Sequence, residues 1–142
     1  PYCFEIEASA EMASTESGKK LTLKDLVLAC KRDVEGSFVL IEGAGGLYSP
    51  IAEATLNVDL AVELQLPVLI VIRDELGAIS QALLTLEAAK KNKLTVACVV
   101  LNVVNSNNLS NKEALAAYTE TPIISFSQGD LGAFCSEIEK LI

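Results

Sequence analysis

The chain has 142 residues, of which 51% are hydrophobic and 21% are charged. This length predicts a single domain over residues 1–142. Nineteen acidic residues outnumber eleven basic ones, and the net charge of −8 would repel a phosphate backbone, which excludes nucleic acid as an expected partner. The longest apolar run, residues 66–72, is too short for a membrane-spanning helix and is typical of a buried strand.

The chain has four cysteines and no histidine. The cysteines form no C-x-x-C pair, so we do not expect a structural zinc site. Unpaired cysteines without an export leader indicate a reducing compartment, and we expect a cytoplasmic protein. The lack of histidine removes the usual general base.

Apolar periodicity predicts the first elements. Residues 2–8 alternate apolar and acidic positions and predict a partly exposed strand, whereas residues 9–20 are polar and predict a loop. Thr22 and Asp25 fit a capping box that opens a helix, and Gly36 would end that segment. The apolar stripe of this helix would comprise Leu23, Leu26, Val27 and Cys30.

Helices and strands then alternate. We expect a strand at residues 38–41, a short helix at 57–64, and further strands at 68–72, 95–101 and 123–126. A helix should follow Gly77, with Ile79, Leu83, Leu86 and Ala89 on one side. Ser110 and Glu113 form a second capping box, for a helix through Tyr118. Asp130 can cap the last helix, whose inward positions would be Phe134, Ile138 and Leu141.

Strands this apolar are typically covered on both faces. The predicted fold is therefore α/β, with a mainly parallel sheet flanked by helices.

Glu42 and four following residues form the first candidate site. A carboxylate directly after a buried strand is placed as a magnesium ligand would be in a nucleotide-hydrolysing fold. The residues Gly43, Ala44, Gly45 and Gly46 would bring backbone N–H groups close to an anion. A sharp turn with an exposed acid explains the same string.

Two further strand ends are candidates, since ligands bind at the carboxyl ends of parallel strands. The first is the string Leu76, Gly77, Ala78, Ile79 and Ser80, where free N–H groups at a helix start could hold a carboxylate. The second is Asn102, whose amide can pair with a purine edge. Taken alone, a plain helix cap at residues 76–80 and a turn-forming asparagine at Asn102 are the favoured explanations.

No G-x-x-x-x-G-K-[ST] string occurs in the chain. The nearest, residues 17–20, lacks the earlier glycine and the Ser/Thr after lysine. Pro1 leads directly into strand-like sequence, so we expect the phosphate-binding loop to lie on an upstream segment that this chain lacks.

These strings resemble the dethiobiotin synthetase family. Residues 39–47, Val-Leu-Ile-Glu-Gly-Ala-Gly-Gly-Leu, are similar to its V-E-G-A-G-G-L signature. Residues 66–71 with 76–79 and 83–85 resemble its L-P-V-I-L-V and L-G-x-I-N-H-x-L-L-T strings, and Asn102 falls where the family has an adenine-contacting asparagine. The order and spacing agree across nearly the whole chain.

The resemblance implies a three-layer P-loop NTPase-like fold and an ATP- and Mg²⁺-dependent ligase. Its substrate 7,8-diaminononanoate is carboxylated by CO₂, and the carbamate then attacks the γ-phosphate of ATP before the ring closes to dethiobiotin, ADP and phosphate. The catalytic lysines would lie upstream, so this chain alone is expected to be inactive.

The resemblance also assigns residues. Glu42 would bind magnesium, residues 43–46 would line the substrate and phosphate end, and residues 76–80 would hold the substrate carboxylate across a homodimer interface. Adenine would be read by Asn102 together with Ile124, Ser125 and Phe126.

The sequence departs from the family's strings at two places, and alternative functions therefore stay open. The family's S-P-H string appears as Ser9-Ala10-Glu11, and its N-H pair appears as Ser80-Gln81. A non-catalytic regulatory or binding domain of the same fold is one alternative. Another ATPase of the same superclass, such as a cobyrinate-type amidase or a partitioning ATPase, is the other.

Overall fold

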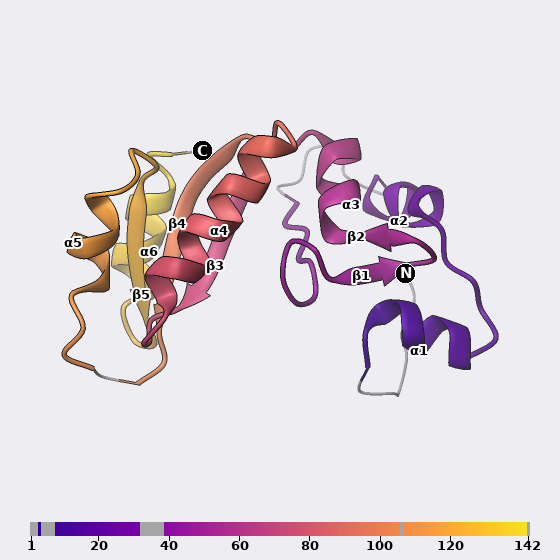
Figure 1. Cartoon of the computed structure of the whole chain (residues 1–142), viewed down its shortest axis with the longest axis horizontal. Helices are drawn as coiled ribbons and strands as arrows, with labels where there is room; N and C mark the ends of the chain where they lie inside the picture. Colours follow the sequence, from indigo (N-terminus) through magenta and orange to yellow (C-terminus); the bar gives the residue numbers. More distant parts are fainter. Residues whose placement is uncertain (1–2, 4–7, 32–38, 106, 142) are drawn as a thin grey trace. The chain divides into compact units, whose positions relative to one another are not determined.

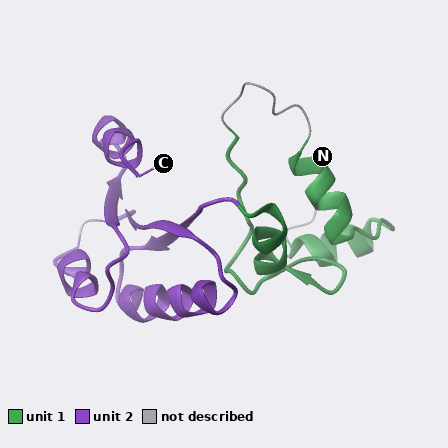
Figure 2. Cartoon of the chain, turned by 90° about the horizontal axis from the view of Figure 1, so that it is seen from above, with its two compact units in different colours: residues 1–65 green, residues 66–142 purple. Residues whose placement is uncertain are grey.

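The computed structural model describes residues 3, 8–31, 39–105 and 107–141. The chain divides into two compact units, residues 1–65 and 66–142 (Figure 2). The expectation of a single domain stays a prediction. The expected strand at residues 2–8 and the expected helix end at Gly36 fall in the stretches outside the described residues.

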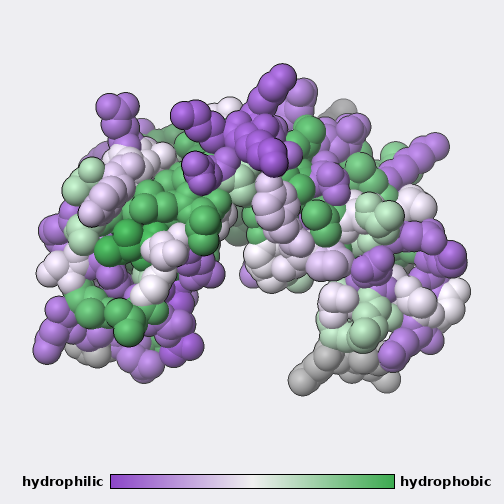
Figure 3. Space-filling model, in the orientation of Figure 1, coloured by the Kyte–Doolittle hydropathy of each residue, from purple (hydrophilic) through white to green (hydrophobic). Residues whose placement is uncertain are grey.

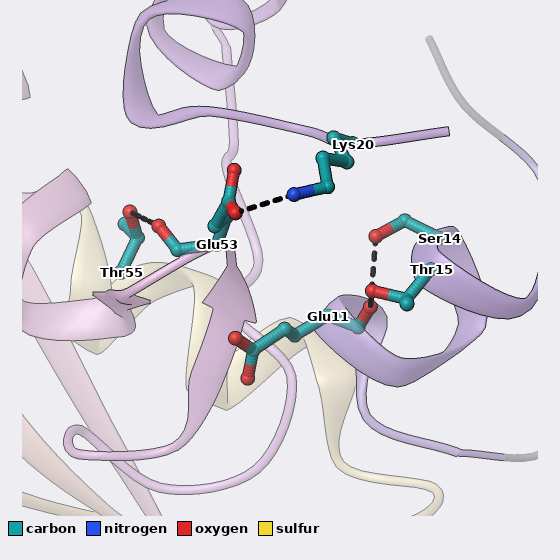
Figure 4. Close-up of polar contacts among 6 residues, drawn as sticks. All are labelled: Glu11, Ser14, Thr15, Lys20, Glu53 and Thr55. Atoms are coloured by element: carbon teal, nitrogen blue, oxygen red, sulfur yellow. Dashed lines mark hydrogen bonds and ion pairs between the residues drawn. The ribbon is translucent and has the colours of Figure 1, made fainter. Parts of the chain in front are cut away.

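The first helix described in unit 1 lies where the sequence predicted a loop over residues 9–20, and that prediction was wrong for residues 10–16. Helix α1 spans Ala10–Glu16, and the Ser9 hydroxyl caps it by accepting from the Met12 N–H at 3.3 Å. The Ser14 and Thr15 hydroxyls both donate to the Glu11 carbonyl, at 2.8 and 2.9 Å (Figure 4). The hydroxyls that indicated a loop are thus satisfied within the helix.

Helix α2 spans Leu23–Cys30 and confirms the predicted capping box. The Thr22 hydroxyl accepts from the Asp25 N–H at 3.3 Å, and the Asp25 carboxylate accepts from the Thr22 N–H at 3.0 Å. Val27 is buried on the predicted apolar stripe, whereas Leu28 beside it is 53% exposed. Just before this helix, Lys20 forms an exposed ion pair with Glu53 at 2.9 Å (Figure 4).

A short hairpin and a helix complete unit 1. Strands β1 (Pro50–Ala52) and β2 (Thr55–Leu56) pair antiparallel, which the sequence did not predict. Helix α3 spans Asn57–Leu64, the predicted bounds. Helix α1 contacts β1 and α2 contacts α3, around a core that contains Ala13, Leu21, Val27, Ile51, Ala52 and Val58.

The strand predicted at residues 38–41 is not formed in its described part, residues 39–41. Leu40 is 74% exposed and Val39 is 39% exposed. A strand needs a neighbour to satisfy its backbone groups. None of the described strands pairs with this segment, so the predicted strand was wrong for these residues.

Unit 2 contains a parallel sheet in the order β3-β4-β5 (Figure 1). The strands are β3 (Val68–Arg73), β4 (Val96–Val103) and β5 (Ile123–Ser127), as predicted to within two residues. The helices between and after them are α4 (Ala78–Lys91), α5 (Asn111–Ala116) and α6 (Leu131–Ile138).

Helices cover both faces of this sheet, which confirms the predicted α/β class. On one face α4 and α5 enclose a core that includes Ile70, Ala82, Val99, Leu101 and Leu115. On the other face Phe134 and Ile138 of α6 pack on Cys98, Val100 and Ile124. The Phe126 and Phe134 rings meet edge-on, with centroids 4.9 Å apart.

Three details of the last two helices differ from prediction. Ser110 and Asp130 occupy the N-cap positions of α5 and α6, but neither side chain makes a capping bond. Both residues have backbone ψ angles of 52° or less, outside the extended conformation that aims a cap side chain at the first turn. Leu141 lies beyond the end of α6 and is 36% exposed, so it is not an inward helix position.

Apolar surface gathers over α4 and α5 of unit 2 (Figure 3). Leu84 is 65% exposed and Tyr118 is 70% exposed, beside a groove of about 790 Å³ that Leu83, Leu86 and Val96 also line. Val96 begins β4, so this groove lies at the amino end of the strands, opposite to the predicted sites of unit 2. Within the described stretches, every helix is too short or too polar to cross a bilayer.

Candidate functional site

The glycine loop, residues 42–49, is the candidate site of unit 1. It runs from the exposed Glu42 through Gly43, Ala44, Gly45 and Gly46 to the hairpin. Among the described residues, the Glu42 carboxylate has no hydrogen-bond or ion-pair partner. A single free carboxylate fits Mg²⁺, which usually takes one or two carboxylates and keeps several waters. The described residues contain no cluster of three metal-binding side chains.

Asn57, the first residue of α3, holds the glycine loop. Its side-chain N–H₂ group donates to the Ala44 carbonyl at 2.7 Å and to the Gly46 carbonyl at 2.8 Å. Its backbone N–H donates to the Ser49 carbonyl at 3.0 Å. The sequence reasoning missed Asn57, although a polar residue at the start of a periodic helix is a recognisable signal.

Ser49 closes the loop from the other side. Its hydroxyl accepts from the Gly46 N–H at 2.8 Å, and its own N–H donates to the Gly46 carbonyl at 2.9 Å. Gly46 therefore lacks the free N–H that the sequence analysis expected of it. Within the described residues the N–H groups of Gly43, Ala44 and Gly45 have no acceptor, so these three remain available to an anion.

Two glycines of this loop are required by their surroundings. Gly45 has a φ of 77°, and a Cβ there would lie 2.5 Å from the Ser49 Oγ. A Cβ at Gly43 would lie 2.7 Å from the Asn57 Oδ1. Real Cβ atoms do not approach other heavy atoms this closely, so the loop tolerates only glycine here without rearrangement.

The candidate site of unit 2 is the turn after β3. The Asp74 N–H donates to the Asn102 carbonyl on β4 at 2.9 Å, and the Arg73 guanidinium forms an ion pair with Glu75 at 3.1 Å. The Ala78 N–H, one of the predicted carboxylate donors, donates to the Glu75 carbonyl at 3.1 Å. Gly77 occupies the N-cap position, and no side chain caps α4.

Two asparagines support this turn from the segment after β4. Asn107 donates to the Asp74 carbonyl at 2.7 Å, and Asn111 donates to the Asp74 carboxylate at 2.6 Å. A pocket of about 230 Å³ opens beside them. It is lined by Arg73, Asp74, Glu75, Leu76, Asn105, Asn107 and Leu109. Of these residues, only Leu76 was predicted from the sequence as part of a site.

The predicted adenine-contacting residues lie on neighbouring strands of unit 2. Asn102 is half-buried within β4, and its register partners are Arg73 on β3 and Phe126 on β5. Ser125 is exposed, whereas the Ile124 side chain is 3% exposed and belongs to the core. Only the backbone of Ile124 is thus available for recognition.

The predicted site residues therefore form two groups. Residues 42–46 lie in unit 1, and residues 76–80, Asn102 and residues 124–126 lie in unit 2. Within unit 2, residues 76–80 and Asn102 share the carboxyl edge of the sheet, where α/β folds bind ligands.

The sequence that forms this glycine loop and parallel sheet matches a known protein family. The profile of the AAA domain family, a family of P-loop NTPases, matches residues 1–126. The chain belongs to this family.

Individual relatives share a more specific name than the description of the family. An ATP-dependent dethiobiotin synthetase BioD from Vesicomyosocius okutanii subsp. Calyptogena okutanii (strain HA) is 49% identical over 99% of this chain and 64% of its own length. The protein of the same name from Ruthia magnifica subsp. Calyptogena magnifica is 45% identical over 99% of the chain and 65% of its own length.

A third relative of that name, from Bacillus thuringiensis subsp. konkukian (strain 97-27), is 34% identical over 96% of the chain and 59% of its own length. The resemblance inferred from the motifs is confirmed. The chain spans between 59% and 65% of the length of these relatives.

Proposed function

We propose that the protein carrying this chain is an ATP-dependent dethiobiotin synthetase. It would carboxylate 7,8-diaminononanoate with CO₂ and close the ureido ring of dethiobiotin, with release of ADP and phosphate. The observation that supports this proposal is the 49% identity to a protein of that name across 99% of the chain. We also propose that the protein is cytoplasmic and homodimeric.

In unit 1, Glu42 and the glycine loop would serve the phosphoryl transfer. Glu42 would be one ligand of Mg²⁺, which when bound neutralises charge on the nucleotide phosphates. The N–H groups of Gly43, Ala44 and Gly45 would donate to oxygens that gain negative charge during the transfer. Gly46 would contribute only its lack of a side chain, because Ser49 already accepts from its N–H.

In unit 2, the carboxyl edge of the sheet would bind the adenine of ATP and the distant carboxylate of the substrate. Asn102 would pair with the adenine edge, and the backbone of residues 124–126 would contact the base beside it. Residues 76–80 would hold the substrate's distant carboxylate. The N–H of Ala78 is used within the turn, so the Ser80 hydroxyl is the side-chain donor that would complete this contact.

A complementation experiment tests the proposal. The chain is joined to the part of its Vesicomyosocius relative that it does not match, and turnover is measured with ATP, bicarbonate and diaminononanoate. We expect turnover from the joined protein and none from the chain alone. ATP hydrolysis that ignores diaminononanoate would point to another ATPase. Binding of both ligands without turnover would point to a non-catalytic domain.

The role of Glu42 is tested in the same joined protein. Glu42→Gln keeps the size of the side chain but removes the charge that would bind Mg²⁺, and kcat should fall roughly tenfold or more. Glu63→Gln is the matched control, since Glu63 lies exposed on α3 away from the loop. Equal activity of the two variants would remove Glu42 from the metal site.

A further inference from the structure

The Asn57 side chain makes two hydrogen bonds to the glycine loop. Both protons of its amide are used, one on the Ala44 carbonyl and one on the Gly46 carbonyl. Its Oδ1 atom is buried without a hydrogen-bond partner, next to Gly43. A buried polar atom without a partner costs stability, so some other demand keeps an asparagine at this position.

The orientation of the amide is fixed by chemistry. Carbonyl oxygens can only accept hydrogen bonds, so the two that face Asn57 require its N–H₂ group. A flipped amide would place Oδ1 against both carbonyls, and the two N–H bonds would be lost. The unpartnered Oδ1 is therefore the consequence of holding two carbonyls with one side chain.

These two bonds also set the direction of the backbone N–H groups. In a trans peptide the carbonyl and the following N–H point in opposite directions, and no described peptide bond is cis. With the Ala44 carbonyl turned toward Asn57, the Gly45 N–H must point away from Asn57. Gly45 is exposed, and among the described residues its N–H has no acceptor.

We propose that Asn57 is a positioning residue that aims the Gly45 N–H at the negative charge developed in the reaction. This inference depends on the proposed function, because it names the residue that orients one of its oxyanion donors. Asn57 itself touches no substrate. It acts by holding the Ala44 carbonyl on the side of the loop opposite to the ligand.

The first test replaces Asn57 by Asp in the joined, active protein. The carboxylate is nearly isosteric but cannot donate, so it repels both carbonyls and releases the loop. A misdirected oxyanion donor should lower kcat roughly tenfold to a hundredfold, with the KM for ATP little changed. Asn57→Ala removes the bonds without adding charge. If the Asp variant folds poorly, the Ala variant should show the same fall in kcat with little change in the KM for ATP.

Two controls separate positioning from general stability. Asp59→Ala removes the carboxylate that accepts from the Leu56 N–H at 2.8 Å, which weakens the start of α3 without touching the loop carbonyls. Asn108→Asp makes the same chemical change at an exposed residue of unit 2. Both controls should keep kcat. A loss of kcat in Asp59→Ala equal to that in Asn57→Asp, at matched melting temperature, would overturn the proposal.

A second readout does not need turnover. Inorganic phosphate is titrated into the ¹⁵N-labelled chain, and the Gly45 amide resonance is followed. We expect a phosphate-dependent shift in the wild type and in Asp59→Ala, and its loss in Asn57→Asp. An unchanged titration in Asn57→Asp, or no shift in the wild type, would overturn the inference. If the joined protein fails to make dethiobiotin while the Gly45 shift still depends on Asn57, the proposed function fails and the positioning role stands.

Discussion

Asn111 donates its side-chain amide to the Asp74 carboxylate at 2.6 Å, which joins the first residue of α5 to the turn after β3. The same amide donates to the Glu75 carbonyl at 3.2 Å. Asn111 is 8% exposed and is one of the few buried polar residues of the described chain. A side chain so placed fixes the turn from which residues 76–80 follow.

Replacing Asn111 by Ala should destabilise unit 2. The change leaves the partly buried Asp74 carboxylate without its donor, while the Glu75 carbonyl keeps only the Ala78 N–H. We expect the free energy of unfolding to fall by about 1–3 kcal/mol, measured by urea denaturation at pH 7. Asn108→Ala, at an exposed position, is the control. A loss below about 0.5 kcal/mol, the usual range for surface changes, would show that the bond is dispensable.

The capping box of α2 should make part of the stability depend on acid pH. The hydrogen bonds from the Thr22 hydroxyl and backbone N–H lower the pKa of Asp25. A carboxyl with a lowered folded pKa stabilises the protein above its unfolded pKa of about 3.9, and this contribution is lost as the pH falls through the folded pKa. We expect Asp25→Asn to flatten the melting-temperature profile below about pH 4.

The comparison needs a second acid as control. Glu16→Gln, at the exposed end of α1, should leave the acid limb of that profile as it is in the wild type. An acid limb equally steep in the wild type and in Asp25→Asn would contradict the assignment.

Gly43 and Asn57 should be energetically coupled. A Cβ at Gly43 would lie 2.7 Å from the Asn57 Oδ1, so Gly43→Ala forces Asn57 or the loop to shift and should weaken the bonds between them. Gly46→Ala is the matched control, because the nearest atom to its Cβ is at 3.9 Å. In the Asn57→Ala background the Gly43→Ala penalty should shrink by about 1 kcal/mol in a double-mutant cycle. Additive penalties would mean that the two residues act independently.

The cysteines should differ in reactivity. Burial raises the pKa of the Cys98 thiol, which is fully buried beneath α6, whereas Cys135 on α6 is exposed. Because the thiolate is the reactive form, iodoacetamide at pH 8 should label Cys135 rapidly and Cys98 only after unfolding. Peptide mapping by mass spectrometry measures both sites at once. Labelling of Cys98 at the rate of Cys135 would contradict the packing of α6 on the sheet.

The sequence predicted unit 2 well because its signals are local and agree with one another. The strand at residues 68–72 is a continuous apolar run after Pro67, and the strand at 123–126 follows Pro122 in the same way. A run of this kind predicts a strand without any knowledge of its neighbours, although its burial varies and Val71 on β3 is 62% exposed. The bounds of α3 were predicted for a similar reason, since its apolar period is regular.

Unit 1 was harder because its structure depends on contacts that the pattern does not encode. The serines and threonine after Ser9 favour turns in isolation, yet their hydroxyls find carbonyls one turn earlier in α1. The apolar residues 39–41 satisfy the pattern of a strand but have no described partner. The start of α3 marks Asn57 as a polar residue but does not reveal what it binds, because its partners, Ala44 and Gly46, lie more than ten residues earlier in the chain.

The strand order of the parallel sheet in unit 2 also bears on the order in which its strands can pair during folding. Val68 pairs with Val96, and Val99 pairs with Ile123, so each strand joins the one made just before it, with a single helix between them. Closing such short crossovers costs little chain entropy. During synthesis β3 and β4 can therefore pair before β5 has left the ribosome, because each pairing joins strands that are neighbours in the order of translation.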